Sequence, residues 1–84
     1  MYLIGDIGNT DIKICLYNSN LALVKKIRFR TQISNKKYLS QNLKFLKEYN
    51  NKIDKILFSS VVPKIFNLIK SILRKIIKKP CLEL

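Results

Sequence analysis

The sequence predicts an α/β fold with the element order β-β-β-α-β-α-β, incomplete at its C-terminus. Apolar and polar residues alternate through most of the first 31 residues, which is the pattern of half-buried strands. Two later stretches carry apolar residues at helical spacing, and a short, almost wholly apolar segment separates them. Three consecutive strands are therefore expected before helices and strands alternate.

The first three strands are expected at residues 2–7, 11–18 and 21–31. A polar turn joins the first two, and Asn18-Ser19-Asn20 forms the second turn, because such residues favour turn conformations. The apolar register of the third strand slips near Val24-Lys25-Lys26, which predicts a β-bulge there.

The first helix is expected at about residues 35–49, with Ser34 as its N-cap. Its apolar stripe consists of Leu39, Leu43 and Leu46, with Phe45 and Tyr49 alongside. Asn50-Asn51 ends this helix. The fourth strand follows at about residues 53–59, and its apolar centre is typical of a strand that is buried on both faces.

The second helix begins at Pro63, a residue favoured in the first helical turn, and Pro80 is expected to stop it. Its apolar side consists of Ile65, Ile69, Ile72 and Ile76, widened by Phe66, Leu73 and Ile77. Lysines and one arginine occupy the other side, so the helix could also lie on an anionic membrane. Packing against the predicted sheet is favoured, because surface helices are normally amphipathic. Cys81-Leu82-Glu83-Leu84 begins a fifth strand.

This order of elements is that of a ribonuclease-H-like core. No Gly/Ser/Pro-rich linker and no internal repeat interrupts it, so residues 1–84 are expected to be one incomplete domain. With 48% hydrophobic and 26% charged residues, the composition is that of a globular protein. No segment is long enough to span a membrane, and the N-terminus lacks the features of a signal peptide.

The residue types exclude two common kinds of site. The chain has two cysteines and no histidine, which excludes Cys/His zinc sites and catalytic triads that depend on histidine. Two reduced thiols are typical of a cytoplasmic protein. The net charge of +12 raises the possibility of nucleic-acid binding, but the lysines are spread along the chain. We therefore expect a solvated basic surface and neither nucleic acid nor a membrane as a partner.

The turn between the first two strands carries the groups that a nucleotide phosphate tail and its metal require. Gly8 permits close approach of the backbone and a positive φ, and free N–H groups of the turn can bind phosphate oxygens. Asn9 and Thr10 can donate hydrogen bonds, and Lys13 can supply a point charge. Asp6 can hold Mg²⁺ directly or through water. An ordinary hairpin turn uses similar residues, so this motif alone leaves both interpretations open.

A second motif favours the nucleotide interpretation. The apolar fourth strand ends in Ser59-Ser60-Val61-Val62-Pro63. Together with Asp6-Ile7-Gly8-Asn9-Thr10 and Lys13, it resembles the N-terminal part of the type III pantothenate kinases. That family belongs to the superfamily of acetate and sugar kinases, heat-shock-cognate proteins and actin. The resemblance extends over all 84 residues and implies the same ribonuclease-H-like fold.

The resemblance implies an ATP-binding segment from Asp6 to Lys13. Asp6 would lie near Mg²⁺, and the phosphates would contact Gly8, Asn9, Thr10 and Lys13. Two positions of the segment, Ile7 and Ile12, match the motif but are expected to pack in the core, and Asp11 occupies a variable position with no assigned chemistry. Ser59 and Ser60 could contact the nucleotide or simply form a tight corner.

By the same resemblance, the reaction is the ATP-dependent phosphorylation of pantothenate, the first step of coenzyme A biosynthesis. The family's catalytic aspartate, its Gly-x-Asp-Arg pantothenate loop and its K⁺ site lie farther along the chain, so no catalytic residue and no second domain are expected here. Family members are homodimers. The alternatives are a non-catalytic module of this fold that binds a nucleotide or a partner, and a basic protein unrelated to kinases.

Overall fold

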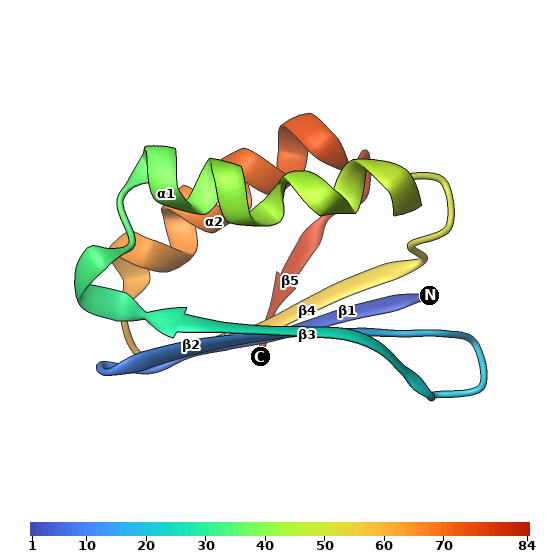
Figure 1. Cartoon of the computed structure of the whole chain (residues 1–84), viewed down its shortest axis with the longest axis horizontal. Helices are drawn as coiled ribbons and strands as arrows, with labels where there is room; N and C mark the ends of the chain where they lie inside the picture. Colours follow the sequence, from blue (N-terminus) through green and yellow to red (C-terminus); the bar gives the residue numbers. More distant parts are fainter.

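A five-stranded sheet with two helices on one of its faces makes up the fold (Figure 1), and the computed structural model describes all residues from 1 to 84. The strands are β1 (Tyr2–Ile7), β2 (Asp11–Tyr17), β3 (Leu23–Arg30), β4 (Lys55–Ser60) and β5 (Cys81–Glu83). The helices are α1 (Lys36–Leu43) and α2 (Pro63–Ile76), and the two short 3₁₀ helices are η1 (Thr31–Ile33) and η2 (Lys44–Tyr49).

The sheet order is β3-β2-β1-β4-β5. The pairs β1–β2 and β2–β3 are antiparallel, whereas β4 runs parallel to both β1 and β5. Hairpins connect the antiparallel strands, and helices make the crossovers to the parallel ones. This topology confirms the predicted element order and is consistent with an incomplete ribonuclease-H-like fold.

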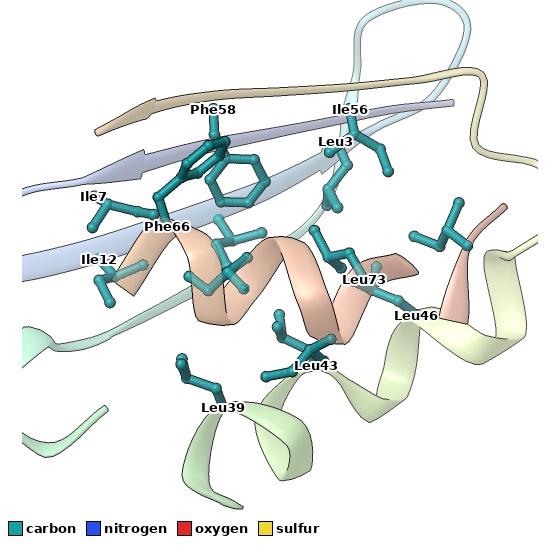
Figure 2. Close-up of a cluster of buried hydrophobic side chains, with 14 of the residues drawn as sticks. Leu3, Ile7, Ile12, Leu39, Leu43, Leu46, Ile56, Phe58, Phe66 and Leu73 are labelled. Atoms are coloured by element: carbon teal, nitrogen blue, oxygen red, sulfur yellow. The ribbon is translucent and has the colours of Figure 1, made fainter. Parts of the chain in front are cut away.

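A single hydrophobic core lies between the sheet and the helices (Figure 2). Alternate residues of each strand point into it, so Leu3 and Ile7 of β1 are fully buried while Ile4 and Asp6 are exposed on the opposite face. The helices supply the facing side chains, which are Leu39, Leu43, Leu46, Phe66, Ile69, Ile72 and Leu73, and Ile77 directly after α2 joins them. The apolar side of α2 therefore packs on the sheet, as predicted. Neither helix is long and apolar enough to cross a membrane.

The first helix differs from the prediction at both ends. Asn35, and not Ser34, is its N-cap, because the Asn35 side chain accepts a hydrogen bond from the Tyr38 N–H at 2.9 Å. The Ser34 hydroxyl instead donates to the Arg30 carbonyl at 2.7 Å and closes the turn of η1. The predicted continuous helix 35–49 is also divided, since α1 ends at Leu43 and the chain continues to Tyr49 as the tighter η2.

The second helix starts at Pro63 as predicted but ends at Ile76, before Pro80. Ile77 has an extended backbone (φ −124°, ψ 124°) and is fully buried, and its N–H donates to the Leu73 carbonyl at 2.7 Å. The helix therefore ends where the chain turns extended at buried Ile77, and Pro80 lies in the connection to β5.

The predicted β-bulge in the third strand is confirmed. Leu16 pairs with Lys25 and Tyr17 pairs with Leu23, so Val24 has no partner on β2. The preceding turn is closed by Asn18, whose side-chain oxygen accepts hydrogen bonds from two backbone N–H groups beyond it. Leu21 in this turn has φ of 62°, so β3 begins at Leu23 and not at residue 21.

Candidate phosphate-binding site

The turn between β1 and β2 has Asn9 and Thr10 at its tip. The Gly8 N–H donates to the Asp11 carbonyl at 2.9 Å, which joins the two strands just before the tip. The N–H groups of Asn9 and Thr10 donate to no other group of the chain, and both residues are exposed. The turn therefore offers two unpaired backbone donors, as an oxyanion site requires.

Gly8 does not have the positive φ that the sequence predicted, because no glycine of the chain has one. Its lack of a side chain matters for a different reason. A Cβ at this position would lie 3.2 Å from the Asp11 carbonyl oxygen, which is tighter than ordinary van der Waals contact. Glycine therefore permits the close approach of β2 at the base of the turn.

Asp6 and Lys13 lie beside each other at the base of the same turn. They are cross-strand neighbours on β1 and β2, and both are exposed on the face of the sheet opposite the helices. They form no ion pair with each other. The carboxylate and the ammonium are thus both available to a ligand next to the backbone donors. Lys13 faces away from the core because it alternates with the buried residues Ile12 and Ile14.

Other residues of the motif have structural roles. Ile7 and Ile12 are fully buried in the core, so only their backbones can face a ligand. Asp11 accepts a hydrogen bond from the Arg28 guanidinium at 2.6 Å, and this bond lowers the pKa of the Asp11 carboxyl below its usual value. The Asp11 charge is therefore already compensated within the chain.

The two serines at the end of β4 differ in their surroundings. The Ser60 hydroxyl accepts a hydrogen bond from the Val62 N–H at 3.0 Å, so it shapes the corner between β4 and α2. Ser59 is exposed and is the β4 neighbour of Asp6. Across the sheet, one row of side chains on the exposed face therefore runs from Ser59 through Asp6 and Lys13 to Arg28.

The sequence did not indicate the contribution of β3 to this site. Beside the turn is an open pocket of about 720 Å³, lined by Asn9, Thr10, Asp11, Arg28, Phe29, Arg30 and Gln32. Arg30 has no ion-pair partner, so its positive charge faces the pocket uncompensated. Alternation along β3 places Arg28 and Arg30 on one face, but only the register with β2 places them beside the turn.

Asp6 is the residue at this site that could hold a metal ion. The chain contains no cluster of three or more aspartate, glutamate, cysteine or histidine side chains. Asp6 is an unpaired, exposed carboxylate, which suits Mg²⁺ that is shared with the phosphates of a ligand and with water.

The motifs and this geometry agree with comparisons to known proteins. The family model for type III pantothenate kinase matches residues 2–84. The chain belongs to the type III pantothenate kinase family. It is also 44% identical, over all of its 84 residues, to the type III pantothenate kinase of Pelagibacter ubique (strain HTCC1062). The match covers 34% of that relative, so the chain spans about a third of its length.

Membership of the type III pantothenate kinase family confirms the resemblance drawn from the two motifs. Both motifs lie within the matched residues, and they meet at one end of the sheet, where β1 and β4 run parallel. In open sheets, ligands bind outside the carboxyl ends of parallel strands. The turn after β1 lies at that end, next to the corner after β4.

Proposed function

We propose that this chain is the ATP-phosphate-binding part of a pantothenate kinase, which transfers the γ-phosphoryl group of ATP to the primary hydroxyl of pantothenate in coenzyme A biosynthesis. One observation supports this most directly. The unpaired N–H groups of Asn9 and Thr10 lie beside an exposed carboxylate, Asp6, and an exposed ammonium, Lys13. In a hairpin turn with only a structural role, these groups would not need to be unpaired.

Each group has a separate task in the proposal. The backbone donors of Asn9 and Thr10 bind phosphate oxygens, and Lys13 adds a point charge to the same phosphates. Asp6 binds Mg²⁺ directly or through water, and the ion neutralises charge on the phosphates. Arg30 raises the positive potential of the adjoining pocket. We assign no residue of this chain to the K⁺ ion that the family implies.

Phosphoryl transfer requires positioning, charge neutralisation and a group that accepts or orients the hydroxyl proton. This chain provides the first two. Of its five carboxylates, Asp6 is proposed to bind Mg²⁺, Asp11 and Asp54 are paired with cations, Glu48 lies on η2 in the helical layer, and Glu83 lies on the edge strand β5. We therefore propose that residues 1–84 form an incomplete N-terminal ATP-binding subdomain and contain no catalytic residue. The complete protein is proposed to be a cytoplasmic homodimer that acts on pantothenate.

A second candidate is a module of the same fold that binds a nucleotide or a partner without catalysis. It is favoured by the absence of an unpaired carboxylate, other than Asp6, beside the turn. The two candidates differ in whether a complete protein phosphorylates pantothenate. The pantothenate kinase requires the turn to bind a nucleotide, whereas the non-catalytic module could bind a partner instead.

The test uses a chimera in which residues 1–84 replace the matching segment of the Pelagibacter ubique relative. Asp6→Asn should abolish pantothenate phosphorylation while the circular dichroism spectrum stays native. Glu48→Gln is the matched control, because it removes another exposed carboxylate that lies far from the turn. A wild-type kcat/KM for Asp6→Asn at saturating Mg²⁺ would contradict the metal role. Nucleotide binding by an inactive wild-type chimera would favour the non-catalytic module.

A further inference from the structure

Thr31 contacts the phosphate-binding turn at two points, although it is 21 or more positions away in sequence. It is the first residue of η1, directly after β3, and it is buried. Its hydroxyl donates to the Gly8 carbonyl at 2.8 Å, and its backbone N–H donates to the Thr10 carbonyl at 2.9 Å. One residue therefore holds two carbonyl groups of the turn.

The bond from the Thr31 hydroxyl to the Gly8 carbonyl replaces the hydrogen bond that usually closes a tight turn. In a tight turn, the carbonyl of the first residue commonly accepts the N–H of the fourth residue. Here the Asp11 N–H makes no bond to the Gly8 carbonyl, and the Thr31 hydroxyl takes its place. The direction of the Gly8 carbonyl is thus set by a side chain from β3–η1 and not by the turn itself.

This direction fixes the orientation of a ligand-binding donor. A trans peptide unit is planar, so its C=O and N–H groups point in opposite directions. The Gly8 carbonyl and the Asn9 N–H belong to the same peptide unit. Because the carbonyl is held toward Thr31, the Asn9 N–H is held away from it, where no group of the chain accepts it.

We propose that Thr31 is a positioning residue that aims the Asn9 N–H at a phosphate oxygen of a bound nucleoside triphosphate. The inference rests on the proposed function, because it concerns the same turn. Thr31 itself is buried behind the turn and does not touch the ligand. Its hydroxyl acts only through the peptide between Gly8 and Asn9.

The chain offers a control for a purely structural role. Ser34 is also buried, and its hydroxyl also donates to a backbone carbonyl, that of Arg30, at 2.7 Å. This bond lies in the same connection between β3 and α1 but does not reach the turn. Both hydrogen bonds are partly buried, and removing either hydroxyl leaves one carbonyl without its donor, so both changes should lower stability to a similar extent.

The experiment compares Thr31→Val, Thr31→Ser and Ser34→Ala in the chimera with the Pelagibacter ubique relative. Loss of one aligned hydrogen bond to a charged oxygen should raise the KM for ATP about tenfold in Thr31→Val. The KM for pantothenate should not change. Thr31→Ser keeps the hydroxyl and should restore the KM for ATP to within about threefold of wild type. Ser34→Ala should lower the Tm and leave the KM for ATP unchanged.

An unchanged KM for ATP in a folded Thr31→Val chimera, with a Tm loss like that of Ser34→Ala, would overturn the proposal and leave the proposed function intact. If Thr31→Val does not fold, Thr31→Ala provides the same comparison, because its smaller side chain adds no bulk. A wild-type chimera that binds no ATP would refute the proposed function and this inference together.

Discussion

The contact between Gly5 and Phe58 yields a stability prediction that can be worked out from distances. Gly5 is buried in the middle of β1, and Phe58 is its neighbour on β4. A Cβ added at Gly5 would lie 2.1 Å from Cε2, 2.4 Å from Cδ2 and 2.5 Å from Cζ of the Phe58 ring. Carbon atoms normally approach to roughly 3.5 Å, so the ring would have to move by about 1.4 Å.

The ring has little freedom to move. Phe58 is fully buried, and its ring centroid lies 6.2 Å from that of Phe66 on α2 (Figure 2). Overpacking of a core by one methyl group costs about 1–3 kcal/mol. Replacing a strand glycine by alanine regains roughly 0.5–1 kcal/mol of backbone entropy. The middle of each range gives a net destabilisation of about 1.2 kcal/mol for Gly5→Ala, which corresponds to a Tm loss of roughly 5–10 °C for a domain of this size.

The assay is thermal and urea unfolding of the 84-residue chain, followed by circular dichroism at a concentration at which the chain sediments as a monomer. Phe58→Leu shortens the side chain that causes the clash, so it should cost less in the Gly5→Ala background than in wild type. A coupling of at least about 1 kcal/mol is expected between the two sites. Gly8→Ala is the control, because its Cβ would meet only one backbone oxygen at 3.2 Å. Equal costs of Phe58→Leu in both backgrounds would refute the reasoning.

Three further predictions concern binding, pH and the isolated chain. Lys13→Ala should raise the KM for ATP or lower kcat at least tenfold, since a charge-assisted contact contributes about 1.5–3 kcal/mol; Lys26→Ala on the same sheet face should do neither. The N-terminal ammonium donates a hydrogen bond to Asp54 at 2.8 Å and lowers the pKa of the Asp54 carboxyl below its ordinary value of 3.8. The stability that this bond contributes is present above pH 3.8 and should be lost as the pH falls below that value. Asp54→Asn should flatten that pH dependence in urea unfolding. The pure 84-residue chain should not phosphorylate pantothenate and should self-associate in sedimentation experiments.

The strands were predictable because their signal is local. Period-two alternation located β1 and β2, and Ile7 and Ile12 lie in the core as expected. The bulge at Val24 was also visible as a slip in this alternation. The identity of the N-cap was not predictable, because Ser34 and Asn35 are both good capping residues. The choice between them depends on the Arg30 carbonyl, which takes the Ser34 hydroxyl.

The candidate site was predictable only in part, because some of its residues are brought together by strand pairing and not by the local sequence. The turn residues are contiguous, so their chemistry could be inferred from sequence. The contributions of Arg28, Arg30 and Thr31 require the register between β2 and β3, which places them beside the turn. A one-residue shift of that register would move all three away from it. No local pattern in β3 or η1 distinguishes Arg28, Arg30 and Thr31 from the residues around them.

The proposed site separates nucleotide binding by backbone groups from metal binding by a carboxylate. The proposed phosphate donors are backbone groups of Asn9 and Thr10, and the fold itself leaves them unpaired. In the proposed site, nucleotide binding depends on how β3 and η1 hold the turn, whereas metal binding depends on one carboxylate, Asp6. The two can be separated experimentally. Substitution of Asp6 should weaken the Mg²⁺ dependence of nucleotide binding, while substitution of Thr31 should weaken nucleotide binding at every Mg²⁺ concentration. If nucleotide binding by both variants showed the same Mg²⁺ dependence, the prediction would be wrong, and the turn and the Asp6 carboxylate would act together.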